Sequence, residues 1–179
     1  MNRRIVHFSA YAAALALAAA LAACSGFGDR EPTVSQPSFY RDIAAGNALD
    51  ANGAAAMISN YRTNNGLPPV TLDPALMKMA DEQARAMAAR NKLDHAVVGT
   101  FQVRLKRSGF DAAAAAENIS AGYHTMAEAF SGWRDSPQHK ANMLLKTATR
   151  MGIAAVYMPG TKYKVFWALV LAAPDEKRS

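Results

Sequence analysis

The amino-acid sequence predicts an α+β fold in which helices come first and strands close the chain. Apolar residues recur at helical spacing after Asp73-Pro74, an opening typical of a helix with Asp as N-cap and Pro at its first position. The last part of the chain changes to runs of Val, Ile, Phe, Tyr and Ala around a turn at Pro159-Gly160, which predicts a β-hairpin. A further extended segment at residues 117–121 completes an antiparallel sheet with helical layers around it.

The first residues form a segment that is typical of export. Arg3 and Arg4 give a basic start, residues 5–23 are almost wholly apolar, and small residues precede Cys24, as in a secretory signal. Leu-Ala-Ala-Cys resembles the bacterial lipobox, in which the cysteine receives a diacylglycerol and becomes the first residue after cleavage. An uncleaved membrane anchor is the alternative, because the run approaches the roughly 20 residues that a spanning helix needs.

These features divide the chain into a signal peptide at residues 1–23, a tether at 24–38 and one domain at 39–179. The tether is rich in Gly, Ser and Pro, so we expect it to be flexible. Cys24 is the only cysteine, which excludes an intramolecular disulfide and leaves its thiol for the lipid. We expect a protein anchored by lipid to the cell envelope, at the outer membrane facing the periplasm if the host is Gram-negative.

Charge argues against one large class of partners. The chain has 20 basic and 14 acidic residues, a net charge of +6, and loss of Arg3 and Arg4 with the signal peptide lowers the net charge to +4. A mildly basic protein suits contact with an anionic envelope surface. The basic residues are scattered and no aromatic-basic motif accompanies them, so we expect no nucleic-acid partner. We expect a single domain and a monomer.

The predicted elements begin with two helices. Residues 39–65 are rich in alanine and compatible with a helix, which we expect Gly46 and Gly53 to interrupt and Asn65-Gly66 to end. The next helix runs from Pro74 to about Arg90, with apolar residues recurring on one face. The residues expected to face the core in this second helix are Leu76, Met79, Ala80, Gln83, Ala84 and Met87.

Shorter elements follow these helices. A helix is expected near residues 100–108, ending at Gly109, and residues 112–116 are expected to be a linker into the extended segment. Residues 126–133 predict another helix. Its expected core-facing residues are Ala127, Phe130 and Trp133.

The last helix and the hairpin complete the pattern. Ser136 followed by Pro137 repeats the combination of an N-cap and a first helical proline. The hairpin then joins a strand at residues 151–158 to a strand at residues 163–172. Apart from the extended segment near Glu117, all the predicted helices of the domain therefore precede the predicted strands.

Three residues far apart in the chain stand in segments that favour one shared polar pocket. His95 follows Lys-Leu-Asp, Glu117 opens Glu-Asn-Ile-Ser-Ala-Gly, and His139 lies in Ser-Pro-Gln-His-Lys-Ala-Asn-Met-Leu. Two imidazoles and one carboxylate are enough for a divalent metal site with open positions. The same groups can equally serve the fold, with the carboxylate bonded to a histidine and to nearby backbone.

With their surroundings, these segments resemble bacterial members of the CAP superfamily, also called SCP domains, which includes cysteine-rich secretory proteins, antigen 5 and the plant pathogenesis-related class-one proteins. The resemblance covers residues 54–173, and its motifs are specific in this order and spacing. They begin at Asn60, Leu72, Ala80, His95, Arg104, Glu117, Trp133, Ser136 and Met151. The resemblance implies a three-layer α-β-α sandwich around a small antiparallel sheet.

The resemblance also implies a cavity formed by two histidines and two acidic residues. His95 and His139 match the histidines, and Glu117 matches the first acid. The second acid lies three residues after the tryptophan in the eukaryotic proteins, and that position is Ser136 here. The pocket therefore lacks one of four groups, although zinc or another divalent metal on His95 and His139 stays one interpretation. We expect Asn118 and Asn142 to bond backbone around the pocket.

These observations favour a binding or interaction module over an enzyme. The module would present its groove to an envelope lipid, glycan or protein. The alternative is a metal-dependent hydrolase using His95, Glu117 and His139, in which the metal lowers the pKa of a bound water. A Ser–His–Glu hydrolase is disfavoured, because Ser136 before a proline is better explained as an N-cap and no Gly-x-Ser-x-Gly turn is present. We therefore assign no catalytic residue and no certain cofactor.

Overall fold

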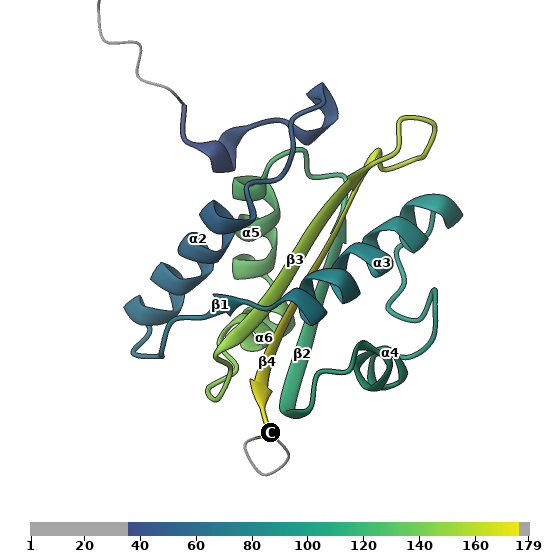
Figure 1. Ribbon diagram of the computed structural model, residues 1–179. Helices are drawn as coiled ribbons and strands as arrows, with labels where there is room; N and C mark the ends of the chain where they lie inside the picture. The colour runs from purple at the N-terminus through teal and green to yellow at the C-terminus, as the bar shows by residue number, and fades with distance from the viewer. Residues whose placement is uncertain (1–35, 176–179) are drawn as a thin grey trace, which may run out of the picture. The chain divides into compact units, whose positions relative to one another are not determined.

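The computed structural model describes residues 36–175, which form three layers with helices on both faces of one sheet (Figure 1). This arrangement is the α+β sandwich that the sequence predicts. No helix within these residues is long and apolar enough to cross a membrane. The predicted signal peptide, Cys24 and most of the tether lie outside the described residues. In chain order the elements are η1 (Ser38–Tyr40), η2 (Ile43–Ala45), α2 (Ala51–Asn64), β1 (Thr71–Leu72), α3 (Pro74–Arg90), α4 (Phe101–Ser108), β2 (Ala112–Ala121), α5 (Met126–Asp135), α6 (Pro137–Met143), β3 (Arg150–Tyr157) and β4 (Val165–Pro174).

The strand order of the sheet is β1-β3-β4-β2. Strand β4 pairs antiparallel with β3 and with β2, so the predicted hairpin is confirmed. The sequence did not predict β1, which pairs parallel with the start of β3 through Thr71 opposite Arg150 and Leu72 opposite Met151. The sheet is therefore antiparallel except along this short pairing at one edge.

Strand β2 begins earlier than predicted. Residues 112–116 were expected to be a linker, but they pair with β4, with Ala114 opposite Ala173 and Ala116 opposite Leu171. Alanine has a low intrinsic preference for strands, and hydrogen bonding to a fully buried partner strand outweighs that preference. The correction matters for the site, because Glu117 then lies inside a long strand and not at the start of a short one.

The sheet separates two apolar cores, because successive residues of a strand point to opposite faces. On one face, α2, α5 and α6 pack against the odd-numbered residues of β3 and β4. On the other face, α3 packs against the even-numbered residues of β4, with α4 beside it. Every residue from Val165 to Ala173 of β4 is buried, so this strand forms the centre of the molecule's packing.

Helix α3 agrees closely with its prediction. Asp73 is the N-cap, and its carboxylate accepts the backbone N–H groups of Ala75 and Leu76. All six residues expected to face the core are buried. Helix α4 also has the predicted ends, since Thr100 caps its start and Gly109 follows its last residue in the left-handed conformation, with φ of 78°.

The interruption expected at Gly46 is confirmed, because Gly46 takes a left-handed conformation with φ of 87° after η2. The interruption expected at Gly53 is wrong, because the Asp50 side chain caps the start of α2 and Gly53 lies in the first turn of that helix. In α5 the predicted face is shifted: Trp133 is buried as expected, but the other buried residues are Met126 and Ala129.

Arg62 in α2 is a buried charge that the sequence did not reveal. Its side chain has no exposed surface, and its guanidinium donates to four backbone carbonyls. The acceptors are the carbonyls of Pro68, Met143, Leu145 and Ala148. Burial lowers the pKa of Arg62. The side chain thus ties α2 to the loop before β1 and to the segment between α6 and β3.

Candidate functional site

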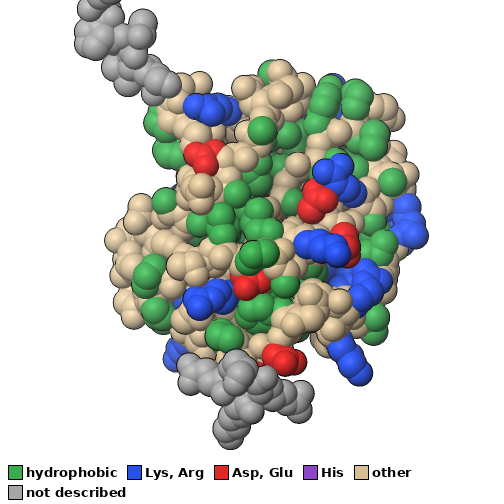
Figure 2. Space-filling model, in the orientation of Figure 1, with side chains coloured by type: hydrophobic (Ala, Val, Ile, Leu, Met, Phe, Trp, Pro, Cys, Tyr) green, Lys and Arg blue, Asp and Glu red, His purple; other side chains and the backbone are tan. Residues whose placement is uncertain are grey.

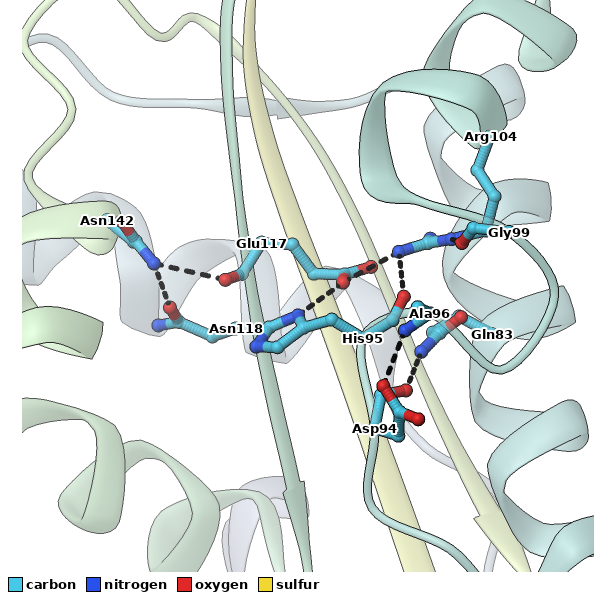
Figure 3. A network of polar contacts seen from close by, with 9 residues as sticks. All are labelled: Gln83, Asp94, His95, Ala96, Gly99, Arg104, Glu117, Asn118 and Asn142. Atoms are coloured by element: carbon cyan, nitrogen blue, oxygen red, sulfur yellow. Dashed lines mark hydrogen bonds and ion pairs between the residues drawn. The ribbon is translucent and has the colours of Figure 1, made fainter.

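Strand β2 sends the two central site residues to opposite faces of the sheet. Glu117 points toward α3 and α4, where it meets His95 and Arg104, whereas Asn118 points toward α6 (Figure 3). Both residues are buried. This alternation is the ordinary geometry of a strand, and it explains why consecutive residues serve two different segments.

The Glu117 carboxylate holds two cationic or hydrogen-bonding side chains through a single oxygen. Its Oε1 accepts from Arg104 Nη2 at 2.8 Å and lies 2.7 Å from His95 Nδ1. The exposed fractions of the Glu117 and Arg104 residues are 6% and 2%, so this pair is almost wholly removed from water. A charged pair at this distance and burial is strongly coupled, because the protein interior screens it less than water does.

Arg104 also fixes the loop that carries His95. Its Nη2 donates to the backbone carbonyl of His95 at 3.0 Å, and its Nε donates to that of Gly99 at 3.3 Å. From α3, the buried Gln83 donates to the carbonyl of Asp94 at 2.8 Å. The loop is therefore tied to two helices before any ligand is bound.

These contacts set the tautomer of the His95 ring. The Glu117 carboxylate can only accept a hydrogen bond from Nδ1 of His95, so Nδ1 carries the hydrogen in the neutral ring. Nε2 of the same ring is left as an acceptor. The His95 side chain is 53% exposed, so it stands partly in solvent while one of its nitrogens is anchored. The result is an imidazole whose orientation is set by a buried ion pair.

His139 is carried by α6. Burial lowers the pKa of His139, and the positive charge of a protonated His95 lowers it further. Its backbone carbonyl accepts from Asn118 Nδ2 at 2.9 Å. Asn142 bridges α6 to β2 by donating to the Glu117 carbonyl and to Asn118 Oδ1. The predicted roles of both asparagines are confirmed.

The structure joins His95 to Glu117, but within residues 36–175 no hydrogen bond or ion pair joins the His139 ring to either of them, so the shared pocket of all three stays a prediction. The Ser136 side chain is not engaged there. Ser136 stands at the N-cap position of α6, before Pro137, yet its side chain makes no capping hydrogen bond, so that part of the prediction is wrong. Only its backbone carbonyl acts there, accepting from Lys140 at 2.8 Å. No hydrogen bond in residues 36–175 joins the Ser136 hydroxyl to His139 or Glu117. The Ser–His–Glu arrangement therefore gains no support.

The residues present do not fit the metal site that the resemblance implies. Within the described part of the chain, no group of three or more His, Cys, Asp and Glu residues could hold a metal ion. Glu117 Oε1 is already shared between His95 and Arg104, and although Oε2 has no partner there, the Arg104 guanidinium beside it repels a cation. The interpretation with zinc on His95 and His139 lacks its third ligand.

Arg104 is the site residue whose role sequence reasoning missed. It begins one of the matching motifs, but a charged residue in a polar helix is ordinarily assigned to the surface. The available signal was its spacing. One side of α4 carries Phe101, Leu105 and Ser108, which follow one another at helical spacing. Arg104 lies on the same side, so it shares the face that packs inward.

His124 stands apart from the other two histidines. Its Nδ1 lies 3.5 Å from Asp42 Oδ2, and its side chain is 41% exposed. Because it shares the residue type but not the pocket, His124 is a matched reference for substitutions at His95 and His139.

Comparison with known proteins agrees with this fold. Residues 55–171 match the model of the Cysteine-rich secretory protein family. The uncharacterized protein YkwD of Bacillus subtilis is 31% identical over 97 residues, which are 53% of this chain and 38% of that protein.

Two solved structures have a similar fold. An extracellular protein of Bacillus anthracis containing an SCP domain has 25% identity and a TM-score of 0.58, over 70% of this chain and 42% of that one. An outer surface protein of Borrelia burgdorferi has 18% identity and a TM-score of 0.59, over 68% of this chain and 90% of that one. This chain thus spans about two fifths of the length of the two Bacillus proteins.

Proposed function

Because the chain belongs to the Cysteine-rich secretory protein family, we propose that it is an exported binding module of the bacterial envelope. We place its ligand in a proposed groove between His95 and His139, with Glu117 and Arg104 as the buried support. The extracellular and outer-surface descriptions of the two similar solved structures support an envelope location. The lipobox-like sequence before Cys24 supports attachment through lipid.

The observation that carries this proposal is the fixed orientation of His95. Glu117 and Arg104 anchor Nδ1 and the loop backbone, at 2.7 and 3.0 Å, while half of the side chain stays exposed. Holding a surface histidine with a buried ion pair costs free energy, because both charges of the pair must be removed from water. Such support is expected where an exposed nitrogen must meet a ligand in one direction.

The chemistry of the groove favours a ligand rich in hydroxyl groups, of which an envelope glycan is the best candidate. The Nε2 of His95 is left as an acceptor, and a neutral His139 ring has one acceptor nitrogen and one N–H donor. Hydroxyl groups satisfy both kinds of group. The lowered pKa of His139 favours its neutral ring near pH 7. The groove lacks an engaged nucleophile among the described residues, so binding and not hydrolysis is the activity that it supports.

Binding is tested with the full chain in detergent solution, against separated glycan, lipid and protein fractions of a bacterial envelope. We expect the glycan fraction to bind, and His95→Gln or His139→Gln to weaken that binding at least about tenfold, as for loss of a well-placed hydrogen bond. His124→Gln is the matched control and should leave binding unchanged. Failure of every fraction to bind, or equal binding by the three variants, contradicts the proposal.

Attachment through Cys24 is tested separately. Cells given a labelled fatty acid should incorporate the label into the full chain, and Cys24→Ser should abolish both the label and recovery in the membrane fraction. A chain that stays membrane-bound without label would instead support the uncleaved anchor. Neither result bears on the groove, so the two parts of the proposal stand or fall independently.

A further inference from the structure

Exposed hydrophobic side chains gather around the turn between β3 and β4. Within the described residues, three of the five exposed large hydrophobic side chains belong to two segments, at residues 90–94 and 157–164. The first segment begins at the last residue of α3, and the second contains the turn. The Lys162 N–H donates to Asn91 Oδ1 at 2.9 Å, so the two segments lie side by side and are called the tip surface below. The three side chains are Leu93, Tyr157 and Met158.

The tip surface is basic as well as apolar. It carries four basic side chains and one acidic side chain, and the acidic one, Asp94, already pairs with Lys92 Nζ at 2.7 Å. Figure 2 shows hydrophobic side chains at the upper right of the molecule, over the turn, with Lys and Arg side chains close by. Such a surface attracts an anionic partner that also offers an apolar layer. The basic residues are Arg90, Lys92, Lys162 and Lys164.

The backbone of the tip surface is unusual at Lys164. Among residues 36–175, the non-glycine residues with a left-handed backbone are Asn91, with φ of 48°, and Lys164, with φ of 64°. Asparagine tolerates this conformation, but lysine pays a steric cost there that glycine does not. Within the described chain, the Lys164 side chain has no hydrogen bond or ion pair to account for its place. The fold alone therefore favours glycine at this position, and the lysine charge is left for a contact outside the domain.

The described chain begins at the same end of the molecule as the tip surface. In Figure 1, η1 and η2 lie at the end where β3 and β4 are joined, and η2 packs against β3. Cys24 stands 12 residues before Gln36. A chain of that length spans at most about 40 Å when fully extended. Attachment at Cys24, or through an uncleaved anchor before it, therefore keeps this end of the domain near the membrane.

We propose that the tip surface docks on the anionic lipid bilayer to which the chain is attached. Tyr157 and Met158 enter the headgroup region, where an amphipathic tyrosine ring is favoured. Lys162 and Lys164 contact the lipid phosphates around them. The inference rests on the membrane attachment in the proposed function, in either of its forms, and is independent of glycan binding. It adds the surface with which the domain meets the membrane.

A bilayer suits the tip surface better than a second protein does. Its two segments comprise 13 residues, whereas a stable protein interface takes roughly 20–30 residues from each partner. A weak contact is enough for an attached chain, because a short tether raises the effective concentration of its target to roughly the millimolar range. Two copies of the chain meeting tip to tip would also bring like charges together.

The first test places a tryptophan on the tip surface. The chain has two tryptophans, Trp133 and Trp167, and both are buried. The full chain is reconstituted into vesicles of phosphatidylglycerol and phosphatidylethanolamine whose acyl chains carry bromine, which quenches an indole on contact. We expect quenching of Tyr157→Trp and none of wild type. Val103→Trp is the matched control and should stay unquenched, because Val103 is also exposed but lies on α4, at the other end of the molecule (Figure 1).

The second test removes a charge without straining the fold. Lys164→Gly suits the left-handed backbone, so it should not lower the temperature of thermal unfolding. In the Tyr157→Trp background, the ratio of docked to free tips measured by quenching should nevertheless fall roughly fivefold, as for one lysine at an anionic surface. Lys164→Arg should keep docking. Lys146→Gln, which removes an exposed charge before the start of β3, should leave docking unchanged.

Three results would overturn docking: an unquenched Tyr157→Trp, equal quenching in vesicles of neutral phosphatidylcholine, or cross-links between the tips of two copies that replace lipid contact as the protein density rises. Recovery of the chain with the vesicles is measured first. A chain that is not recovered contradicts the membrane attachment itself and this inference with it. An attached chain with an unquenched tip contradicts docking alone, so the two failures are distinguishable.

Discussion

At the residue scale, the buried charges organise the candidate site. Arg104 and Glu117 meet at 2.8 Å with side chains that are 1% and 2% exposed. Each charge loses its hydration and is compensated only by the other and by nearby hydrogen bonds. The pair therefore acts as one unit, and its loss should disturb the His95 loop as well as the fold's stability.

A double-mutant cycle tests this coupling. Arg104→Met leaves the Glu117 carboxylate buried without its partner, and we expect the free energy of unfolding to fall by about 3–5 kcal/mol. Arg104→Met combined with Glu117→Leu should recover a large part of that loss, because no charge stays buried. Denaturant unfolding of the single and double variants measures the coupling energy. Additive effects would mean that the pair is not a unit.

The pH dependence of stability reports the environment of His139. Its pKa in the folded protein is lowered by burial, so the unfolded chain binds a proton at higher pH than the folded one does. Stability should be complete above the ordinary histidine pKa of 6.5 and should fall as pH decreases from there through the folded pKa. His139→Gln should flatten this decline in denaturant unfolding at a series of pH values, and His124→Gln should not. Parallel stability curves for wild type and His139→Gln would contradict a lowered pKa of His139 as the cause of the decline.

Sequence reasoning predicted that His95 and Glu117 lie together, but not what supports them. Their proximity was predictable because both stood in recognisable segments, whereas the place of His139 beside them stays a prediction. Arg62 and Arg104 were not predictable, since the composition of a helix does not say which charged residue will find buried carbonyls or a buried carboxylate. The prediction that the Ser136 hydroxyl caps α6 was wrong for a related reason. The preference for serine at an N-cap position does not determine where its hydroxyl points.

At the element scale, the contact between α3 and β3 depends on one glycine. A Cβ atom built at Gly152 would collide with the backbone carbonyl of Leu76 and the backbone nitrogen of Met77. The first turn of α3 therefore lies directly on β3. Because backbone atoms cannot move aside as a flexible side chain can, this glycine sets the distance between the helix and the sheet.

Gly152→Ala should consequently destabilise the protein strongly, by about 2–4 kcal/mol, as an overpacked core position. Gly160→Ala is the control, because a Cβ there meets nothing within 4 Å. Thermal unfolding of the two variants measures the difference. A Gly152→Ala variant as stable as Gly160→Ala would show that α3 is not seated on β3 in this way.

Elements differed in how far the sequence determined them. Helix α3 was predictable because Asp73, Pro74 and a regular apolar face all indicate the same structure. The alanines at the start of β2 and the two-residue β1 were not, because their strand conformation comes from partners distant in sequence, at Ala173 and at Arg150. Such pairing cannot be deduced from local preference.

At the scale of the whole molecule, the sheet separates two apolar cores and presents the candidate site at one edge. That edge is β2, where Glu117 contacts His95 and Arg104, and Asn118 contacts α6. Strand β4 pairs with β2 and is buried along nearly its whole length. In the proposed function, this edge is where the domain would hold a glycan.

The most direct test of the central claim is NMR of the histidine side-chain nitrogens in the full chain, recorded with and without an envelope glycan fraction. The free protein should hold His95 with its hydrogen on Nδ1, and glycan should shift Nε2 of His95 together with the ring nitrogens of His139. His124 should not shift, and a chelator should change nothing. A hydrogen on Nε2 of His95, shifts confined to His124, or signals that depend on metal would contradict the account.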